Sequence, residues 1–233
     1  MPECVTAATP FTCDVLTDFS ALDPCVQIAT DATNDVGKPA SAPPGTMVGW
    51  EMADGRVRYV TATDTMYVGI NTPGVAGDAD GDGDPNSASA GWFLALGGED
   101  FANNDETESI GARFDIDEDG VYDIIVGFSA TAPFGPRWSE HSPGFFFIAT
   151  PFAAFSSDIG AVHEGTATAT STSCKHFEIS ITSWSTIPLS SGSDGADTFL
   201  ATFFAGSFDD DGVGEDHIAG NTNPVQFCTP GLP

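Results

Sequence analysis

Acidic residues recur at alternate positions in three short, glycine-containing stretches of the chain, residues 78–84, 115–123 and 209–216. Carboxylates packed this closely repel one another unless a cation lies among them. Calcium is the expected cation because it takes roughly six to eight oxygen ligands, supplied by carboxylates at alternate loop positions and by a backbone carbonyl, while glycine permits the sharp turn. The three stretches therefore predict calcium-binding loops.

The middle stretch, residues 115–123, is the most specific of the three. Its predicted ligands, at loop positions 1, 3, 5, 7 and 9, are Asp115, Asp117, Asp119, the carbonyl of Val121, and Asp123. Position 12 is Val126 instead of the bidentate glutamate of an EF-hand, and we expect strands instead of helices on both sides. An acidic turn that holds no ion is the alternative interpretation.

The first and third stretches extend the predicted ligand set. In the first, a proline at position 85 fixes the exit turn, and the alternating carboxylates are Asp78, Asp80, Asp82 and Asp84. The third is less regular, and its predicted ligands are Asp209, Asp211, Glu215 and Asp216. Residues 103–106 are a weaker candidate, because a polar turn explains them equally well.

Residues 115–123 resemble the calcium loops of dockerin, thrombospondin type 3 and integrin-type repeats, in which an Asp-x-Asp-x-Asp-Gly run binds calcium outside a helix pair. This resemblance implies calcium binding and carries no information on the fold. Residues 67–85, 177–181 and 206–216 also look like parts of secreted surface modules of the carbohydrate-binding and DOMON-like β-sandwich type. The second resemblance implies a sandwich across residues 46–220 and assigns no binding residue.

The elements that position these loops are expected to be strands. Short β-branched and aromatic runs recur between turn signals, and residues 177–181 alternate between apolar and polar side chains, as expected for a strand with one face on the core and the other toward solvent. We therefore expect an all-β fold, an antiparallel, jelly-roll-like β-sandwich of roughly nine to eleven strands with Asp/Gly-rich calcium loops at strand connections. The expected strands are residues 57–61, 65–70, 91–96, 109–114, 121–130, 144–150, 161–171, 176–184 and 198–205.

The first 45 residues differ in composition from the rest of the chain. They are rich in Pro, Ala, Thr, Asp and Cys with little periodicity, which predicts an extended N-terminal arm (residues 1–45) before the sandwich (residues 46–233). The five cysteines form no CxxC pair, so disulfides are the expected use, with the pairing open and one thiol left over. They are Cys4, Cys13, Cys25, Cys174 and Cys228.

The charge balance limits the possible partners. Six Lys and Arg residues against 34 Asp and Glu residues give a formal net charge of −28. This excess argues against nucleic acid or an anionic membrane as a partner, since both need a cationic face. The solvated acidic surface of a halophilic protein is the alternative explanation, but the concentration of aspartate in glycine-containing loops favours metal binding.

An extracellular or cell-surface location is expected from calcium loops combined with disulfides. The first residues contain no basic region and no apolar run, so we expect no signal peptide among them. No apolar run approaches the ~18 residues that a membrane-spanning helix needs, so no membrane insertion is expected.

Catalytic motifs are not recognisable. The chain contains no nucleophile elbow and no HExxH motif. Because it has 34 acidic residues, the sequence cannot single out two carboxylates as the catalytic pair of a glycoside hydrolase. We therefore expect no enzyme activity. The chain has eighteen Phe and three Tyr residues. Recognition surfaces prefer Tyr and Trp, so this ratio indicates that most of the aromatic side chains are buried in the core. Trp138, in a proline-rich segment, is the best candidate for an exposed contact residue.

These patterns together predict an extracellular calcium-binding structural or adhesive protein. It is expected to self-associate as a subunit of a surface layer, sheath or filament stabilised by calcium and disulfides. The alternative is a calcium-dependent carbohydrate-binding module, whose glycan partner lies in a groove lined by Trp138 or Trp184.

Overall fold

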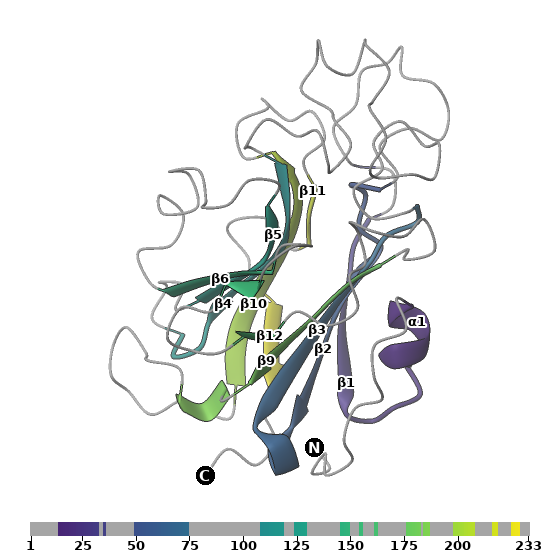
Figure 1. The fold of residues 1–233 in the computed structure, drawn as a ribbon. Helices are drawn as coiled ribbons and strands as arrows, with labels where there is room; N and C mark the ends of the chain where they lie inside the picture. The colour runs from purple at the N-terminus through teal and green to yellow at the C-terminus, as the bar shows by residue number, and fades with distance from the viewer. Residues whose placement is uncertain are drawn as a thin grey trace, which may run out of the picture.

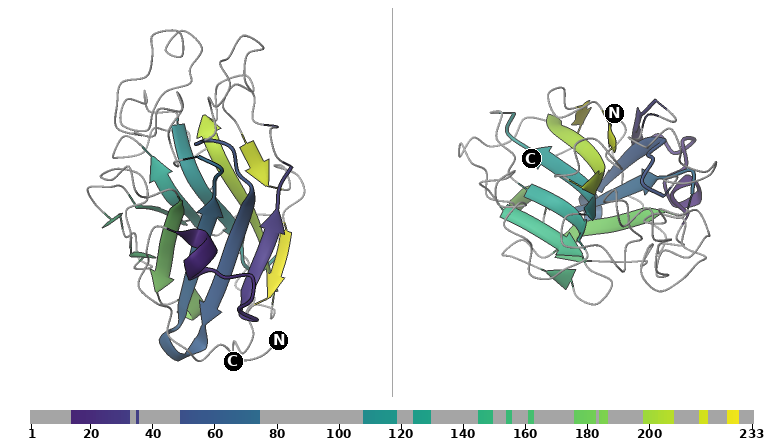
Figure 2. Two further views of the ribbon diagram at one scale, coloured as in Figure 1. Left: turned by 90° about the vertical axis from the view of Figure 1, so that its right-hand side faces the viewer. Right: turned by 90° about the horizontal axis from the view of Figure 1, so that it is seen from above.

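Two β-sheets pack face to face, with a single-turn helix outside one of them (Figures 1 and 2). The predicted all-β sandwich is therefore confirmed. No helix among the described residues combines the length and the apolar character needed to cross a membrane. The computed structural model describes residues 14–32, 35, 49–74, 108–118, 124–129, 145–149, 154–155, 161–162, 176–182, 184–186, 198–207, 216–218 and 225–228.

The first sheet, sheet A, has the strand order β1-β2-β3-β9-β8, and all its neighbours are antiparallel. Its strands are β1 (Val26–Thr30), β2 (Asp54–Val60), β3 (Thr65–Asn71), β8 (Ala161–Val162) and β9 (Phe177–Thr182). The β2–β3 hairpin turns through a 3₁₀ segment, η1 (Thr61–Thr63), and through Asp64, which has a left-handed backbone with φ of 47°. A second 3₁₀ segment, η4 (Trp184–Thr186), follows β9.

The second sheet, sheet B, has the order β11-β10-β4-β5-β6-β7, and β12 also pairs with β10. Its pairs are antiparallel except β5–β6, which is parallel and departs from the expected pattern. The strands are β4 (Glu108–Asp115), β5 (Ile124–Ser129), β6 (Phe145–Ala149), β7 (Ala154–Phe155), β10 (Thr198–Ser207), β11 (Asp216–Ile218) and β12 (Val225–Cys228).

The core lies between the sheets, where alternate side chains of both sheets meet. Phe199, with no exposed surface, lies 5.5 Å from the Trp184 ring and 5.5 Å from the Phe227 ring, measured between centroids. Phe114 packs edge-on against Trp184 at 5.3 Å. Such aromatic pairs add to the free energy gained by burying their apolar area. The cluster therefore joins β4, β10 and β12 of sheet B to η4, which follows β9 of sheet A.

Gly55 of β2 marks the closest approach of the two sheets. A Cβ placed there would lie 2.6 Å from ring atoms of Phe203, which comes from β10 of the facing sheet. We therefore expect Gly55→Ala to lower the free energy of unfolding by about 1–3 kcal/mol, the usual range for overpacking a core. Urea unfolding measures this loss. An alanine variant as stable as the parent would show that the sheets do not pack this tightly at Gly55.

The sheets are also joined along one edge by a single amide side chain. The Gln27 Nε2 of β1 donates to the Cys228 carbonyl of β12 at 2.6 Å, and the Cys228 amide donates to Gln27 Oε1 at 2.8 Å. The Gln27 side chain thus satisfies both backbone groups of Cys228, as a paired neighbouring strand would do. The edge strands of the described sheets are short, between two and five residues, and short edges limit unwanted strand pairing.

Helix α1 (Val15–Asp18) covers the outer face of sheet A, as the left view of Figure 2 shows. A Cβ at Gly69 of β3 would lie 3.0 Å from Val15 and 3.1 Å from Phe19. Every residue of β2 is buried, so this strand is covered on both of its faces.

Part of the predicted N-terminal arm, residues 1–45, differs from the expectation. Residues 14–32 are integrated into the sandwich, because α1 packs on sheet A and β1 pairs with β2. The alternation in β1 spans only five residues and directly follows a turn rich in Asp, Pro and Cys, so the composition of the segment concealed it. The short strands β7, β11 and β12 were also not predicted, and the expected strand at 91–96 lies outside the described residues.

Candidate metal-binding loops and a buried polar strip

The middle acidic stretch forms the whole connection between two paired strands. Phe114 of β4 pairs with Ile124 of β5, so residues 115–123 are all that lies between them. Because directly paired Cα atoms lie about 4.5–5.5 Å apart, the chain leaves and re-enters the sheet at neighbouring points. The first and last predicted ligand positions, Asp115 and Asp123, are each adjacent in sequence to this terminal pair.

Two of the five predicted ligands in this stretch have described side chains. Asp115 ends β4 and is 2% exposed, opposite Leu200 of β10. Asp117, two residues further, is half-buried. The other predicted ligands, Asp119, Val121 and Asp123, lie outside the described residues. A carboxylate as deeply buried as Asp115 needs a compensating charge or hydrogen bonds.

Glu118 lies in the same stretch but faces the sheet. Its backbone is left-handed, with φ of 57°. Its Oε1 accepts hydrogen bonds from Thr198 Oγ1 at 2.6 Å and from Gln226 Nε2 at 2.9 Å. These two hydrogen bonds lower the pKa of Glu118 below its ordinary value, and the bond from Thr198 has the larger effect. Burial acts in the opposite direction and is outweighed. The side chain therefore fixes the start of the loop to β10 and β12.

The other two acidic stretches also connect strands of the sandwich. Residues 209–215 lie between β10 and β11, which pair through Ala205 and Asp216. Residues 78–84 lie between β3 and β4. Because Ser207 pairs with Glu108 at one end of β10 and Leu200 pairs with Asp115 near the other, β10 leads into the third stretch at the end remote from residues 115–123.

Most of the predicted ligands in these two stretches are not described. Asp216 is described only as part of the β11 backbone, and the others lie outside the described residues, namely Asp78, Asp80, Asp82, Asp84, Asp209, Asp211 and Glu215. Within the part of the chain that the structure describes, no three His, Cys, Asp or Glu side chains gather around a point that could hold a metal ion. The calcium loops therefore stay a prediction.

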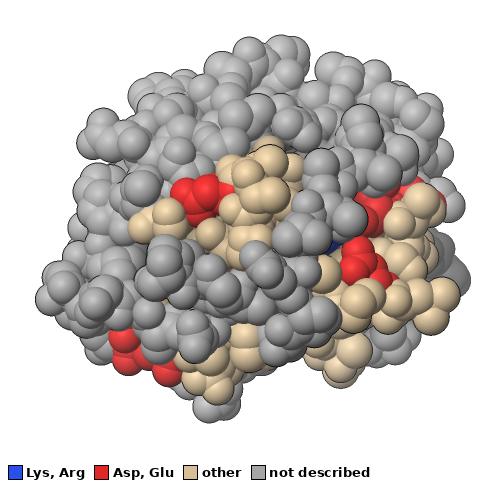
Figure 3. Space-filling view, turned by 90° about the horizontal axis from the view of Figure 1, so that it is seen from below, with Lys and Arg blue, Asp and Glu red and all other residues tan. Residues whose placement is uncertain are grey.

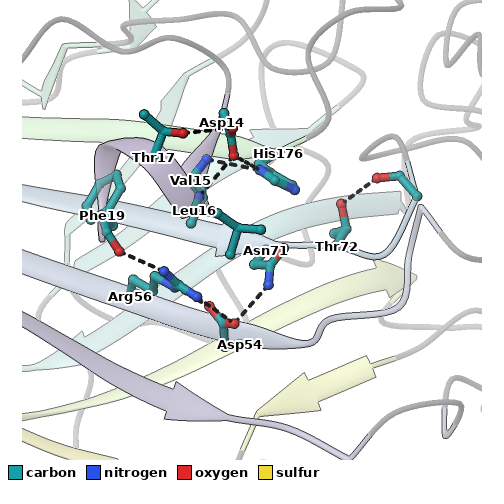
Figure 4. Close-up of polar contacts among 11 residues, drawn as sticks. Asp14, Val15, Leu16, Thr17, Phe19, Asp54, Arg56, Asn71, Thr72 and His176 are labelled. Atoms are coloured by element: carbon teal, nitrogen blue, oxygen red, sulfur yellow. Dashed lines mark hydrogen bonds and ion pairs between the residues drawn. The ribbon is translucent and has the colours of Figure 1, made fainter. Parts of the chain in front are cut away.

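A second polar cluster, which the sequence did not predict, lies on the outer face of sheet A beneath α1 (Figure 4). Paired residues of neighbouring strands point to the same face, and the register places Arg56 opposite Gly69 and Gly69 opposite Glu178. We call this cluster the polar strip. Its members are all buried: Asp54, Arg56, Arg58, His176, Glu178 and Ser180.

Arg56 is the centre of the polar strip. Its Nε and Nη2 donate to the two carboxylate oxygens of Asp54 at 2.5 and 3.0 Å. Its Nη1 donates to the carbonyl of Phe19, at the end of α1, at 2.7 Å. Asn71 Nδ2 donates to Asp54 Oδ2 at 2.8 Å. A bidentate pair of this kind offsets the cost of burying both charges and connects sheet A to α1.

His176 holds the other end of α1. Its Nδ1 accepts a hydrogen bond from the Val15 amide at 2.9 Å, and this contact is buried. Asp14 caps the helix, accepting from the Leu16 amide at 3.1 Å and from Thr17 Oγ1 at 2.9 Å. Burial alone raises the pKa of Asp14, but the hydrogen bonds from Thr17 and Leu16 hold it below its ordinary value.

Half of the basic residues of the chain are buried inside the sheets. Arg56, Arg58 and Arg113 are each no more than 6% exposed, out of six Lys and Arg residues in total. Arg58 pairs with Asp23 at 3.5 Å, and the Arg113 guanidinium lies 5.4 Å from the Phe204 ring centroid. The surface therefore has no more than three basic residues to neutralise its carboxylates. Figure 3 shows red patches of described Asp and Glu residues on the face it draws.

Asp64, at the β2–β3 turn, anchors η4. Its carboxylate accepts from the Tyr59 hydroxyl at 2.8 Å, from the Ser185 amide at 2.9 Å and from Ser185 Oγ at 2.8 Å. Burial, followed by the hydrogen bond and the negative charge of Asp64, raises the pKa of Tyr59 far above its ordinary value. This arrangement stabilises the neutral phenol and fixes Trp184, which directly precedes Ser185, in the core.

We expect alkaline pH to destabilise the protein through Tyr59. The unfolded chain loses the phenolic proton near pH 10, whereas the folded protein keeps it to higher pH. Above about pH 10 the unfolded state thus binds fewer protons, and the free energy of unfolding falls as the pH rises. Urea unfolding between pH 8 and 11 measures this slope. Tyr59→Phe is expected to flatten it, and an equal slope in both proteins would contradict the assignment.

The described tryptophans are part of the core. Trp50 and Trp184 are 1% and 2% exposed. Trp184 therefore cannot line an open sugar-binding groove as the carbohydrate-binding alternative supposed, because its ring lies against Phe114 and Phe199. Trp138 lies outside the described residues.

The described cysteines are of two kinds. Cys228 is a free, half-buried thiol on β12, and Cys25 is disulfide-bonded. Since Cys4, Cys13 and Cys174 lie outside the described residues, the pairing stays a prediction.

The polar strip was missed because the alternating strand at 177–181 was expected to place Glu178 and Ser180 in solvent. The available signal was the arginine spacing, since two of only six basic residues, Arg56 and Arg58, stand on one face of β2.

Comparison with protein-family models, with curated proteins and with solved structures found no match to this chain.

Proposed function

We propose that this chain is an extracellular calcium-binding structural or adhesive protein that assembles into a surface layer, sheath or filament, and that it is not an enzyme. The observation that carries the proposal is the position of residues 115–123. An aspartate-rich stretch with calcium-loop spacing forms the entire connection between two paired strands, and its first carboxylate, Asp115, is buried.

The distribution of charge supports the same proposal. The chain carries a net charge of −28, and three of its few cations are buried in the sheets, where they pair with carboxylates or pack on an aromatic ring. The remaining carboxylates repel one another, so bound calcium favours the compact state. Divalent ions in strand connections neutralise charge where it is densest along the chain.

In this proposal calcium acts by making the strand connections rigid. An ion held by residues 115–123 fixes the ends of β4 and β5, and Glu118 joins the same connection to β10 and β12. A coordination position left open to solvent accepts a carboxylate from another copy, which links subunits. We propose this bridging in preference to strand addition because the described edge strands are short. Disulfides from the remaining cysteines add covalent stability.

Calcium titration calorimetry of two matched variants tests the ligand assignment. Asp117→Asn removes one charge from the predicted ligand set, and we expect the protein to lose one calcium ion or to bind it at least tenfold more weakly. Glu118→Gln removes the same charge from the neighbouring residue, whose carboxylate faces Thr198 and Gln226, and we expect calcium binding to stay unchanged. Equal binding by Asp117→Asn and the parent contradicts the loop assignment.

Light scattering tests the assembly half of the proposal separately. We expect the parent protein to grow in size as calcium is added and to return to its starting size with EDTA. A protein that binds calcium and yet stays monomeric at millimolar calcium and high protein concentration contradicts assembly while leaving the metal sites intact.

A further inference from the structure

We propose that α1 is a pH-sensitive strap, docked on sheet A while His176 is neutral and released when Nδ1 of His176 takes up a proton. The contacts that carry this inference lie at the two ends of the helix and beneath it (Figure 4). They involve neither the acidic loops nor calcium, so the inference is independent of the proposed function.

The hydrogen bond between Val15 and His176 fixes the protonation state of the imidazole. A backbone amide always carries its hydrogen, so Nδ1 accepts from Val15 at 2.9 Å only with a free lone pair. The docked state therefore contains neutral His176 with its proton on Nε2. The Asp14 carboxylate lies 3.6 Å from Nδ1, beyond hydrogen-bond distance, and is engaged by Leu16 and Thr17.

The helix depends on these contacts because it is too short to be stable alone. A single turn does not recover the cost of helix nucleation without packing. Val15 and Phe19 supply the packing, since both lie against Gly69 of β3. Arg56 holds the carbonyl of Phe19 at one end, and His176 holds the Val15 amide at the other. Loss of the His176 contact thus removes one of the described attachments of α1.

Protonation converts this attachment into a repulsion. A proton on Nδ1 points at the Val15 N–H, so two donors face each other and the buried amide loses its partner. Asp14 Oδ1, which already accepts from the Leu16 amide, lies 3.6 Å from Nδ1 and must move closer before it can accept the new proton. Among the described residues, the other charged groups on the elements around His176 are Asp18 of α1, Asp54, Arg56 and Arg58 of β2, and Glu178 of β9. Negative charge on the carboxylates favours the protonated ring, and the two arginines oppose it.

The direction of the pH effect follows from the number of protons bound. In the released state the imidazole takes up a proton near its ordinary pKa of about 6.5, whereas the docked state keeps Nδ1 unprotonated. The released state therefore binds more protons below about pH 6.5, and docking is strongest above it and weakens as the pH falls. The Asp14 cap is lost at lower pH, because its carboxylate has a pKa below its ordinary value. Release uncovers the polar strip.

Amide hydrogen exchange of the full chain, followed by NMR at constant calcium between pH 7.5 and 5.0, tests this inference. We expect the protection factor of the Val15 amide, corrected for the intrinsic exchange rate, to be constant above about pH 7 and to fall up to tenfold per pH unit below pH 6.5. The amide of Val68 in β3 serves as the internal control and is expected to change little over the same range.

A variant and a spectrum make the test specific. In His176→Asn the side-chain oxygen takes the place of Nδ1 as an acceptor and does not titrate, so we expect Val15 protection to become independent of pH. A long-range ¹H–¹⁵N spectrum of the parent at pH 7.5 reports the tautomer directly, whether or not the variant folds, and is expected to show a proton on Nε2 alone. A proton on Nδ1 at pH 7.5, or parent protection that does not change with pH, overturns the inference.

Discussion

Replacing Arg56 with alanine is expected to lower the free energy of unfolding by about 3–5 kcal/mol, the usual cost of removing one partner of a buried ion pair. The change leaves the Asp54 carboxylate, in a residue that is 8% exposed, with only the Asn71 amide of its described partners. It also removes the donor to the Phe19 carbonyl that holds the end of α1. Urea unfolding monitored by tryptophan fluorescence measures the loss.

A double variant separates the charge effect from the packing effect. Asp54→Asn combined with Arg56→Met removes both charges, keeps an acceptor for Asn71 and fills a similar volume. Since apolar replacements of buried ion pairs are often neutral, we expect the double variant to recover most of the stability that Arg56→Ala loses. A single alanine variant that costs less than about 1 kcal/mol contradicts the view that Arg56 is the centre of the polar strip.

The second large effect is expected at Phe199, in the aromatic core. Phe199→Ala removes a ring that contacts Phe114, Trp184 and Phe227, and such truncations cost about 3–5 kcal/mol. Leu200→Ala is the matched control, because Leu200 is the next residue on β10, points to the other face and is only half-buried. We expect the control to lose much less in the same urea titration, and equal losses would refute the placement of the core.

The fold class was predictable because its signals are local. Turn residues separate short β-branched and aromatic runs, and the strands at 65–70, 109–114 and 198–205 match β3, β4 and β10 to within two residues at each end. The parallel pairing of β5 with β6 was not predictable, because pairing partners distant in sequence leave no local pattern. The strand β1 was missed because five residues of alternation carry too little signal against turn-rich surroundings.

The candidate site was predictable only in part. The spacing of residues 115–123 predicts a loop between strands, and the register of β4 and β5 agrees with that position. The partners of Glu118 come from β10 and β12, about 80 to 110 residues further along the chain, so no local pattern reveals them. The same holds for His176, whose Nδ1 bonds to an amide 161 residues away. Contacts of this range depend on the tertiary fold.

The most direct test of the central claim is thermal unfolding in three solutions: EDTA alone, EDTA with sodium chloride, and calcium with sodium chloride at the same total ionic strength. Calcium loops predict a melting temperature several degrees higher with calcium than with sodium chloride alone, because only calcium binds the folded state specifically. A solvated acidic surface predicts equal melting temperatures at equal ionic strength, since screening alone then provides the stability. That equality would contradict the account of this protein as a calcium-stabilised sandwich.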